Sequence, residues 1–195
     1  MNTPGRYTMN PFNILLIGCA ALLLTSCFGG KKNAGKVKVS EEIRIDPAKA
    51  KLREKYAKIL EVPQDSITNM KLYAFIDEWY GTHYKWGGTD KSGIDCSAFI
   101  QKLLFEVYNI DLPRTSVSQF YTKDVEKFGS KRYLKEGDLV FYQTDKDKPI
   151  SHVGIYLGHR RFVNAASSHG VSIYNMDDPY WRVSYVGAGR VKVSM

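Results

Sequence analysis

The stretch Gly93-Ile94-Asp95-Cys96-Ser97-Ala98-Phe99-Ile100 begins the helical pattern on which the fold prediction depends. After Cys96, apolar residues recur at three- and four-residue intervals, which is the spacing of one buried helix face. They are Phe99, Ile100, Leu103, Leu104 and Val107. We therefore expect a helix that carries a thiol at its N-terminal end.

The position of Cys96 favours chemistry at its sulfur. The N-terminus of a helix has partial positive charge and free N–H groups, which favour the thiolate, the nucleophilic form of cysteine. The alternative is a structural role, because a lone cysteine is commonly a small buried hydrophobic residue. The rest of the chain must decide between the two.

Length and composition predict one folded domain with an additional tail. The 195 residues suffice for one sizeable core but not for two full domains, and 44% hydrophobic residues argue against disorder. The net charge of +8 is compatible with nucleic acid, an anionic membrane or an anionic cell-wall polymer as partner. Charge alone does not choose among these partners.

The N-terminal segment predicts export and lipidation. Arg6 precedes an apolar run over 14–24, which is short for a membrane span and has the layout of a signal peptide. Leu24-Thr25-Ser26-Cys27 resembles the bacterial lipobox, in which the signal is cut before a cysteine that receives lipid. We expect residues 1–26 to be a lipoprotein signal peptide and Cys27 to be lipidated. An uncleaved anchor helix is the alternative.

The remaining chain divides into three parts. Residues 27–45 begin with the lipidated Cys27 and continue as a Gly- and Lys-rich tether. Residues 46–66 form a basic lead-in, whose Asp46-Pro47 start predicts a helix to Leu60. Residues 67–195 hold the main domain.

Export makes Cys96 unusual. With Cys19 removed in the signal and Cys27 lipidated, no second thiol is left to form an intramolecular disulfide. A solitary thiol in an oxidising compartment is a liability unless it is deeply buried or used.

The sequence pattern of the main domain predicts helices followed by strands. Helices are expected from Ser66 to about Tyr80, from Cys96, and from Ser116 to Lys127. Short strands follow at 138–142, 151–157, 161–165, 171–174 and 182–193. Helices first and an antiparallel meander afterwards predict an α+β fold, with a helical layer against a sheet.

His152 is the candidate base for a cysteine nucleophile. Among His83, His152, His159 and His169, only His152 lies within an apolar strand pattern, on the same face as Gly154. A nucleophilic cysteine needs such a base within hydrogen-bond reach and a third polar group to orient it. A structural histidine held by hydrogen bonds is the alternative.

Five segments, in order and spacing, resemble the NlpC family of papain-like bacterial cell-wall peptidases over roughly residues 70–193. They are Tyr84-Lys85-Trp86-Gly87-Gly88, Ile94-Asp95-Cys96-Ser97-Ala98-Phe99, Leu112-Pro113-Arg114-Thr115-Ser116, Gly137-Asp138-Leu139-Val140-Phe141 and His152-Val153-Gly154-Ile155-Tyr156-Leu157-Gly158. The resemblance implies a papain-like NlpC fold, with N-terminal helices on an antiparallel sheet of five to six strands. It makes residues 67–195 an NlpC-type cysteine peptidase domain and implies neither a metal nor an organic cofactor.

The resemblance also implies catalytic roles. Cys96 would be the nucleophile and His152 the general base, which later protonates the leaving amine. Many family members have a histidine twelve positions after the base, where this chain has Asn164. An asparagine can still accept the imidazole N–H and orient the ring. His169, in a Ser-Ser-His-Gly turn, is the alternative orienting residue.

Four further residues match positions that line the substrate groove in the family. They are Tyr84, Asp95, Ser97 and Ser116. Each also has a structural alternative: Asp95 can stabilise the helix N-terminus, Ser116 can cap a helix, Tyr84 can belong to the core, and Ser97 can be without a role.

The sequence therefore predicts a lipid-anchored peptidoglycan hydrolase of the bacterial cell envelope, facing the periplasm. It would cut a γ-D-glutamyl–diaminopimelate or a diaminopimelate–D-alanine bond through an acyl-enzyme. Its expected partners are peptidoglycan and, through lipid, the membrane, but not nucleic acid. A papain-like amidase or acyltransferase and a catalytically silent wall-binding lipoprotein are the alternatives. The bond cut and the oligomeric state stay open.

Overall fold

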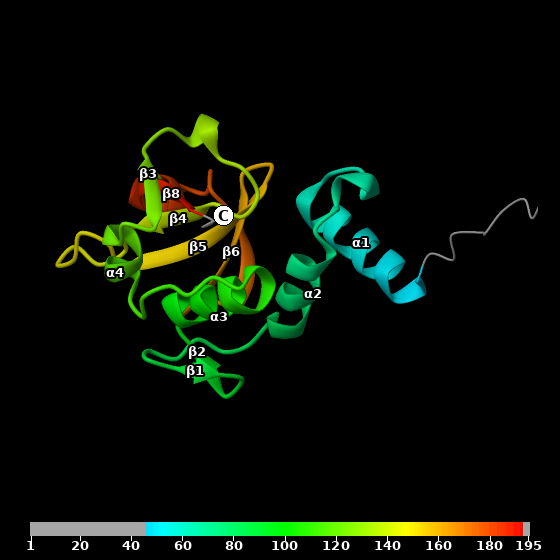
Figure 1. The fold of residues 1–195 in the computed structure, drawn as a ribbon, viewed down its shortest axis with the longest axis horizontal. Helices are drawn as coiled ribbons and strands as arrows, with labels where there is room; N and C mark the ends of the chain where they lie inside the picture. Colours follow the sequence, from blue (N-terminus) through cyan, green and yellow to red (C-terminus); the bar gives the residue numbers. More distant parts are fainter. Residues whose placement is uncertain (1–45, 193–195) are drawn as a thin grey trace, which may run out of the picture. The chain divides into compact units, whose positions relative to one another are not determined.

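The structure is a computed structural model that describes residues 46–192 (Figure 1). The predicted signal peptide, the lipidation site Cys27 and the tether lie outside the described residues. Within the described range, no helix has the length and apolar character needed to cross a membrane.

Within the described residues, two α-helices precede the predicted nucleophile. Helix α1 (Pro47–Leu60) starts as expected, with the Asp46 carboxylate accepting a hydrogen bond from the backbone N–H of Ala48. A short 3₁₀ turn, η1 (Gln64–Ser66), leads to α2 (Met70–Trp79). The prediction that this helix begins at Ser66 was wrong. Asn69 caps α2 by accepting from the N–H of Leu72, so the helix begins four residues later.

Helix α3 (Cys96–Tyr108) confirms the prediction made from the apolar spacing. The Asp95 carboxylate accepts from the backbone N–H of Ala98 at 2.8 Å and caps its start. Asn109, in the left-handed conformation with φ of 57°, ends it. A small antiparallel ribbon, β1 (Thr89–Asp90) and β2 (Gly93–Ile94), leads directly into Cys96.

Helix α4 (Ser116–Tyr121) is shorter than predicted. Thr115 caps it, and Thr122 leaves it with extended backbone. The prediction of helix up to Lys127 was wrong because Val125–Phe128 form strand β3, which pairs with the last strand of the chain.

The strands form one antiparallel sheet of six, in the order β3-β8-β4-β5-β6-β7. The remaining strands are β4 (Leu139–Tyr142), β5 (His152–Gly158), β6 (Arg161–Ala166), β7 (Gly170–Asn175) and β8 (Tyr185–Val191). A second 3₁₀ turn, η2 (Lys131–Tyr133), precedes β4. The predicted α+β fold with five to six antiparallel strands is confirmed.

The final predicted strand was too long at its start. Residues 179–184 form helix α5 (Pro179–Ser184), which includes Arg182. Pro179 occupies the first helical position, where its missing N–H and fixed φ favour a helix over a strand.

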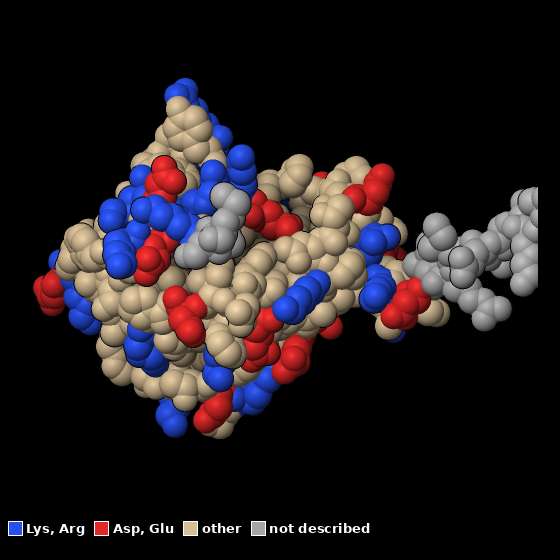
Figure 2. All heavy atoms as spheres, viewed as in Figure 1, with Lys and Arg blue, Asp and Glu red and all other residues tan. Residues whose placement is uncertain are grey.

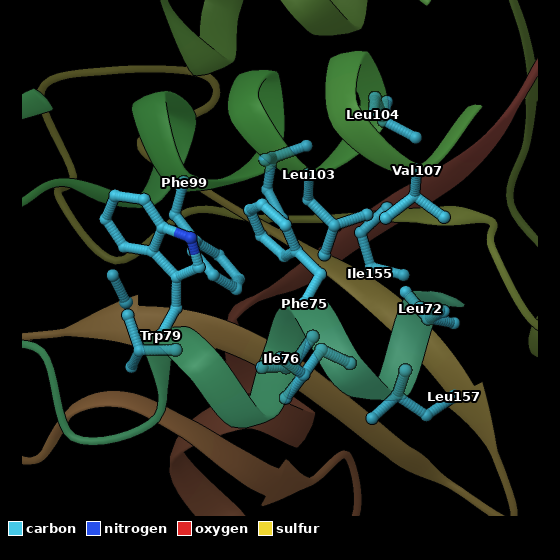
Figure 3. Close-up of a cluster of buried hydrophobic side chains, with 14 of the residues drawn as sticks. Leu72, Phe75, Ile76, Trp79, Phe99, Leu103, Leu104, Val107, Ile155 and Leu157 are labelled. Atoms are coloured by element: carbon cyan, nitrogen blue, oxygen red, sulfur yellow. The ribbon is translucent and has the colours of Figure 1, made fainter. Parts of the chain in front are cut away.

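The main core lies between the helices and one face of the sheet. Figure 3 shows side chains of α2 and α3 directed toward one another beside β5. The residues in this layer include Leu72, Phe75, Ile76, Trp79, Phe99, Leu103, Leu104, Val107, Ile155 and Leu157, all of them buried. Because α3 packs along β5, its N-terminal residue is held close to the first residues of that strand.

A second apolar cluster covers the opposite face of the sheet. It contains Val140, Tyr142, Phe162, Ala166, Met176, Trp181 and Ala188. Side chains alternate along a strand, so His152 points to this face while Val153 points to α3. The candidate base His152 therefore does not lie between helix and sheet but on the opposite face, at the start of β5.

Candidate active site

Cys96 is buried at the start of α3, beside the first residues of β5. The backbone amide of Val153, which directly follows His152, lies close enough to the sulfur to influence its ionisation. Burial raises the pKa of the Cys96 thiol to about 11; the Val153 amide opposes this shift and the Asp95 charge adds to it. The thiol is consequently protonated at neutral pH, because burial outweighs the effect of the helix N-terminus.

His152 is the first residue of β5 and is buried against aromatic rings. It pairs across the sheet with Tyr142, and its ring lies 5.3 Å from that of Trp181, centroid to centroid. Burial lowers the pKa of His152 to about 4, although Asn164 and the Asp95 charge act in the opposite direction. A neutral imidazole at pH 7 can accept the proton of a thiol.

Asn164 lies on β6, on the same face of the sheet as His152. Ile155 pairs with Val163, so continuation of this register places Asn164 beside Gly154, diagonally across from His152. Its side chain is completely buried, and neither of its amide atoms nor His152 Nε2 has a hydrogen-bond partner among the described residues. Asn164 nevertheless lies close enough to the imidazole to influence its ionisation.

The influence of Asn164 on His152 has the sign expected of an orienting residue. Asn164 raises the pKa of the imidazole, as a group that accepts an imidazole N–H does. His169, the alternative, is exposed in the turn between β6 and β7, with its ring 6.2 Å from that of Tyr174. The structure thus brings Asn164, and not His169, to the buried side of the base.

Asp95 and Ser97 belong to a hydrogen-bond network centred on Arg114, a residue to which the sequence analysis gave no role. Arg114 donates to Asp95 through Nη1 at 3.0 Å and Nη2 at 2.7 Å, and to Ser97 Oγ at 2.9 Å. Ser97 donates to Asp95 in turn, and the backbone N–H of Gly87 donates to its second oxygen. The network ties the segment 84–88, the start of α3 and the segment before α4 together.

The same contacts explain the charge state of Asp95. Burial raises its pKa, but the hydrogen bonds from Arg114, Ala98 and Ser97 exceed that effect, so the net shift is downward. Asp95 therefore remains ionised beside the thiol. Its capping of α3 through the Ala98 N–H is the structural role considered from sequence, and the hydrogen bonds from Arg114, Ser97 and Gly87 add to it.

Two neighbouring cavities surround the catalytic candidates. One, of about 420 Å³, is lined by Cys96, Asp95, Ser97, Tyr84 and Ser116, and so includes all four residues predicted to bind substrate. The other, of about 530 Å³, contains His152 and Trp181. Tyr84, Trp86, Lys148 and Ser151 border both. Trp86 and Lys148 were not identified as site residues from sequence.

The arrangement supports nucleophilic chemistry at an amide. The thiol lies beside the second residue of β5 and the neutral imidazole belongs to its first residue, and backbone N–H groups act on the sulfur. Cys96 lines one cavity and His152 the other; because the two cavities share Tyr84, Trp86, Lys148 and Ser151, we call them together the groove. Within residues 46–192, no group of three or more His, Cys, Asp or Glu side chains is arranged to hold a metal ion.

Comparisons with known proteins agree with this geometry. The sequence pattern that defines the NlpC/P60 family matches residues 81–190. The chain is 33% identical to the probable endopeptidase NlpC homolog of Haemophilus influenzae, over 91% of this chain and 97% of that protein. It is 40% identical to the murein DD-endopeptidase MepS/murein LD-carboxypeptidase of Escherichia coli K12, over 58% of each chain.

Solved structures show the same fold. A Staphylococcus aureus protein, described as similar to lipoprotein and of the NLP/P60 family, superimposes with a TM-score of 0.57 at 26% identity. The match covers 65% of this chain and 42% of that one. From the five sequence motifs, the matching fold and the length of these similarities, we conclude that the chain belongs to the NlpC/P60 family.

Proposed function

We propose that this protein is a peptidoglycan hydrolase, a cysteine endopeptidase that cuts an amide bond in murein stem peptides or their crosslinks. One observation carries the proposal: Cys96 at the start of α3 and His152 at the start of β5 line two cavities that share four further residues, and Asn164 is buried on the same face of the sheet as the imidazole. Relatives named as endopeptidases, among them the murein DD-endopeptidase MepS, support the choice of substrate.

The ionisation states define the first step. Neutral His152 takes the proton of the Cys96 thiol as the sulfur attacks the amide carbonyl. The backbone N–H groups at the start of α3 stabilise the resulting oxyanion. The imidazolium then protonates the leaving amine, and the C–N bond breaks to give a thioester. Asn164 holds the ring in the orientation that both proton transfers need.

Water completes the cycle. Neutral His152 takes a proton from a water molecule, the oxygen attacks the thioester carbonyl, and the C–S bond breaks. The carboxylic acid leaves, and the thiolate recovers its proton from the imidazolium. No step requires a metal or an organic cofactor.

The charge of the protein suits a polymer that carries carboxylates. The chain has a net charge of +8, and Figure 2 shows Lys and Arg side chains gathered around the protruding segment between β3 and β4. Opposite charge raises the local concentration of an anionic polymer near the protein. The bond cut is a γ-D-glutamyl–diaminopimelate or a diaminopimelate–D-alanine bond.

We further propose that Cys27 carries lipid, that the membrane holds the protein by this anchor, and that the domain faces the periplasm. The lipobox-like Leu24-Thr25-Ser26-Cys27 supports this assignment. Growth with radiolabelled fatty acid tests it: the protein incorporates label, Cys27→Ala abolishes incorporation, and Cys19→Ala retains it. Equal labelling of all three proteins would contradict the anchor.

Digestion of defined muropeptides followed by mass spectrometry tests the reaction. Endopeptidase action adds one water and produces two fragments cut within the stem peptide or crosslink. Release of ammonia with the gain of one water, and no cut in the stem peptide or crosslink, would indicate an amidase. Transfer of the acyl group to an added amine would indicate an acyltransferase, and either result would replace the proposal.

A further inference from the structure

Trp86 and Lys148 meet over the groove between the nucleophile and the base. Trp86 belongs to the segment before α3, and Lys148 to the loop between β4 and β5, drawn in yellow in Figure 1. Lys148 Nζ lies 4.7 Å from the centroid of the Trp86 ring. Both residues border the cavity of Cys96 and the cavity of His152. A substrate that occupies both cavities therefore lies against these two residues.

The contact is open to solvent and easily displaced. Trp86 is 75% exposed, and the Lys148 side chain is 43% exposed. The loop that carries Lys148 is nevertheless anchored, because the backbone N–H groups of Thr144 and Asp145 both donate to Ser151 Oγ, at 2.6 and 2.9 Å. Lys148 thus carries a flexible ammonium group on an anchored loop that ends next to His152.

The charges around the groove leave Lys148 as the available cation. Within residues 46–192, the cationic side chains that line the two cavities are Arg114 and Lys148. Arg114 is committed to Asp95 by two hydrogen bonds and to Ser97 by a third. Lys148 has a single ion pair, at 3.1 Å, with Asp145, which is 42% exposed. Exposed pairs of this kind are weak and exchange partners readily.

We infer that Lys148 is a specificity-determining residue that binds a carboxylate of the stem peptide, leaving the Trp86 ring when the substrate enters. The inference rests on the proposed function, since it deepens the description of the same groove. A carboxylate offers the ammonium charge-assisted hydrogen bonds, which are stronger than its contact with an exposed aromatic ring. Asp145 competes for Lys148 in the free protein.

Steady-state kinetics with two matched substrates test this role. One is a muropeptide with free stem-peptide carboxylates, and the other is the same muropeptide with those carboxylates amidated. We expect Lys148→Ala to raise KM for the free form about fivefold with kcat unchanged, as for lost binding at a partly exposed ion pair. KM for the amidated form should not change. Lys148→Arg should retain the preference for the free form, and Asp145→Asn should increase it.

Lys146→Ala is the matched control, because Lys146 is an exposed lysine in the same loop that lines neither cavity within the described residues. It should behave as the unmodified protein. Active protein in which Lys148→Ala changes KM for both substrates equally, or for neither, would overturn the role of Lys148 and leave the proposed function standing. Absence of hydrolysis by the unmodified protein would reject both.

Discussion

Arg114 holds both carboxylate oxygens of Asp95, with Nη1 3.0 Å from Oδ1 and Nη2 2.7 Å from Oδ2. This pair lies next to Cys96, the proposed nucleophile, and joins the start of α3 to the segment before α4. The Asp95 side chain is 11% exposed and that of Arg114 is 37% exposed, so the pair is partly shielded from water. The start of the catalytic helix depends on this contact as well as on its own cap.

Asp95→Asn should lower the free energy of unfolding by about 2 kcal/mol, because it leaves a partly buried guanidinium without its counter-ion. Solvent around the partly exposed Arg114 limits the loss. Urea denaturation measures the change. Asp77→Asn is the control, since Asp77 forms an exposed ion pair with Lys55 and should cost less than about 1 kcal/mol. Equal losses of free energy in the two variants would show that the Asp95–Arg114 pair stabilises the protein no more than the exposed Asp77–Lys55 pair does.

Stability should fall as the pH is lowered from 6.5 toward 4, because the folded pKa of His152 is lowered from 6.5 to about 4. Between these values the unfolded chain binds a proton that the folded protein excludes, which favours unfolding. The shift corresponds to about 3 kcal/mol. The folded pKa of Asp95 is also lowered, so the stability that this carboxylate contributes is lost only at still lower pH, where it becomes protonated.

Urea denaturation at about pH 7 and about pH 4.5 measures this dependence. The difference in the free energy of unfolding between the two pH values should be smaller in His152→Gln. His169→Gln serves as the control for removal of an exposed histidine. If His152→Gln keeps the full pH dependence, the buried imidazole is not its source.

Cys96 should react slowly with iodoacetamide at neutral pH, and the rate should continue to rise into the alkaline range. The reason is that burial raises the pKa of the thiol to about 11, and only the thiolate is alkylated efficiently. Mass spectrometry of the protein after timed exposure follows the reaction. A rate that is already constant below about pH 7 would indicate a resting thiolate–imidazolium pair instead.

Asn164→Ala should lower kcat at least about tenfold, because it removes the group that orients the catalytic base. His169→Ala should change kcat little, since that side chain is exposed in the turn after β6. Hydrolysis rates of one muropeptide by the two variants provide the comparison. The opposite ranking would assign the orienting role to His169.

Gly154→Ala should lower the free energy of unfolding by about 1–3 kcal/mol through overpacking beside the base. A Cβ at Gly154 would lie 2.6 Å from Cδ2 of Phe162 and 2.8 Å from the carbonyl oxygen of Val163. Gly129→Ala is the matched control, because a Cβ there meets nothing within 4 Å. Thermal or urea denaturation that gives both variants the same stability would contradict the packing argument.

The features that the sequence predicted correctly have strong local patterns. Five apolar residues at helical spacing sufficed for α3, and alternation around His152 sufficed for β5. Errors arose where competing signals lay within one turn or where distant segments decide the structure. Ser66 and Asn69 both belong to residue types that cap helices, and it is Asn69 that caps α2. Val125–Phe128 become a strand by pairing with β8, more than sixty residues later in the chain.

The candidate site also contains residues that the sequence predicted and contacts that it did not. The motifs predicted Cys96 and His152 because those positions match a known pattern, and Asn164 because of its spacing after His152, where many family members have a histidine instead. The contacts that surround them have no signature in sequence spacing: Arg114 reaches Asp95 across nineteen residues, and Lys148 meets Trp86 between two loops. The ionisation of the thiol also required the structure, since burial, which raises its pKa, opposes the helix N-terminus.

Digestion of purified sacculi tests the central claim most directly. Sacculi incubated with the unmodified protein should release muropeptides cut within stem peptides or crosslinks, as resolved by chromatography and mass spectrometry. Cys96→Ala should release none above the background of sacculi incubated alone. Equal muropeptide profiles from the two proteins would contradict the assignment of this chain as a cysteine endopeptidase.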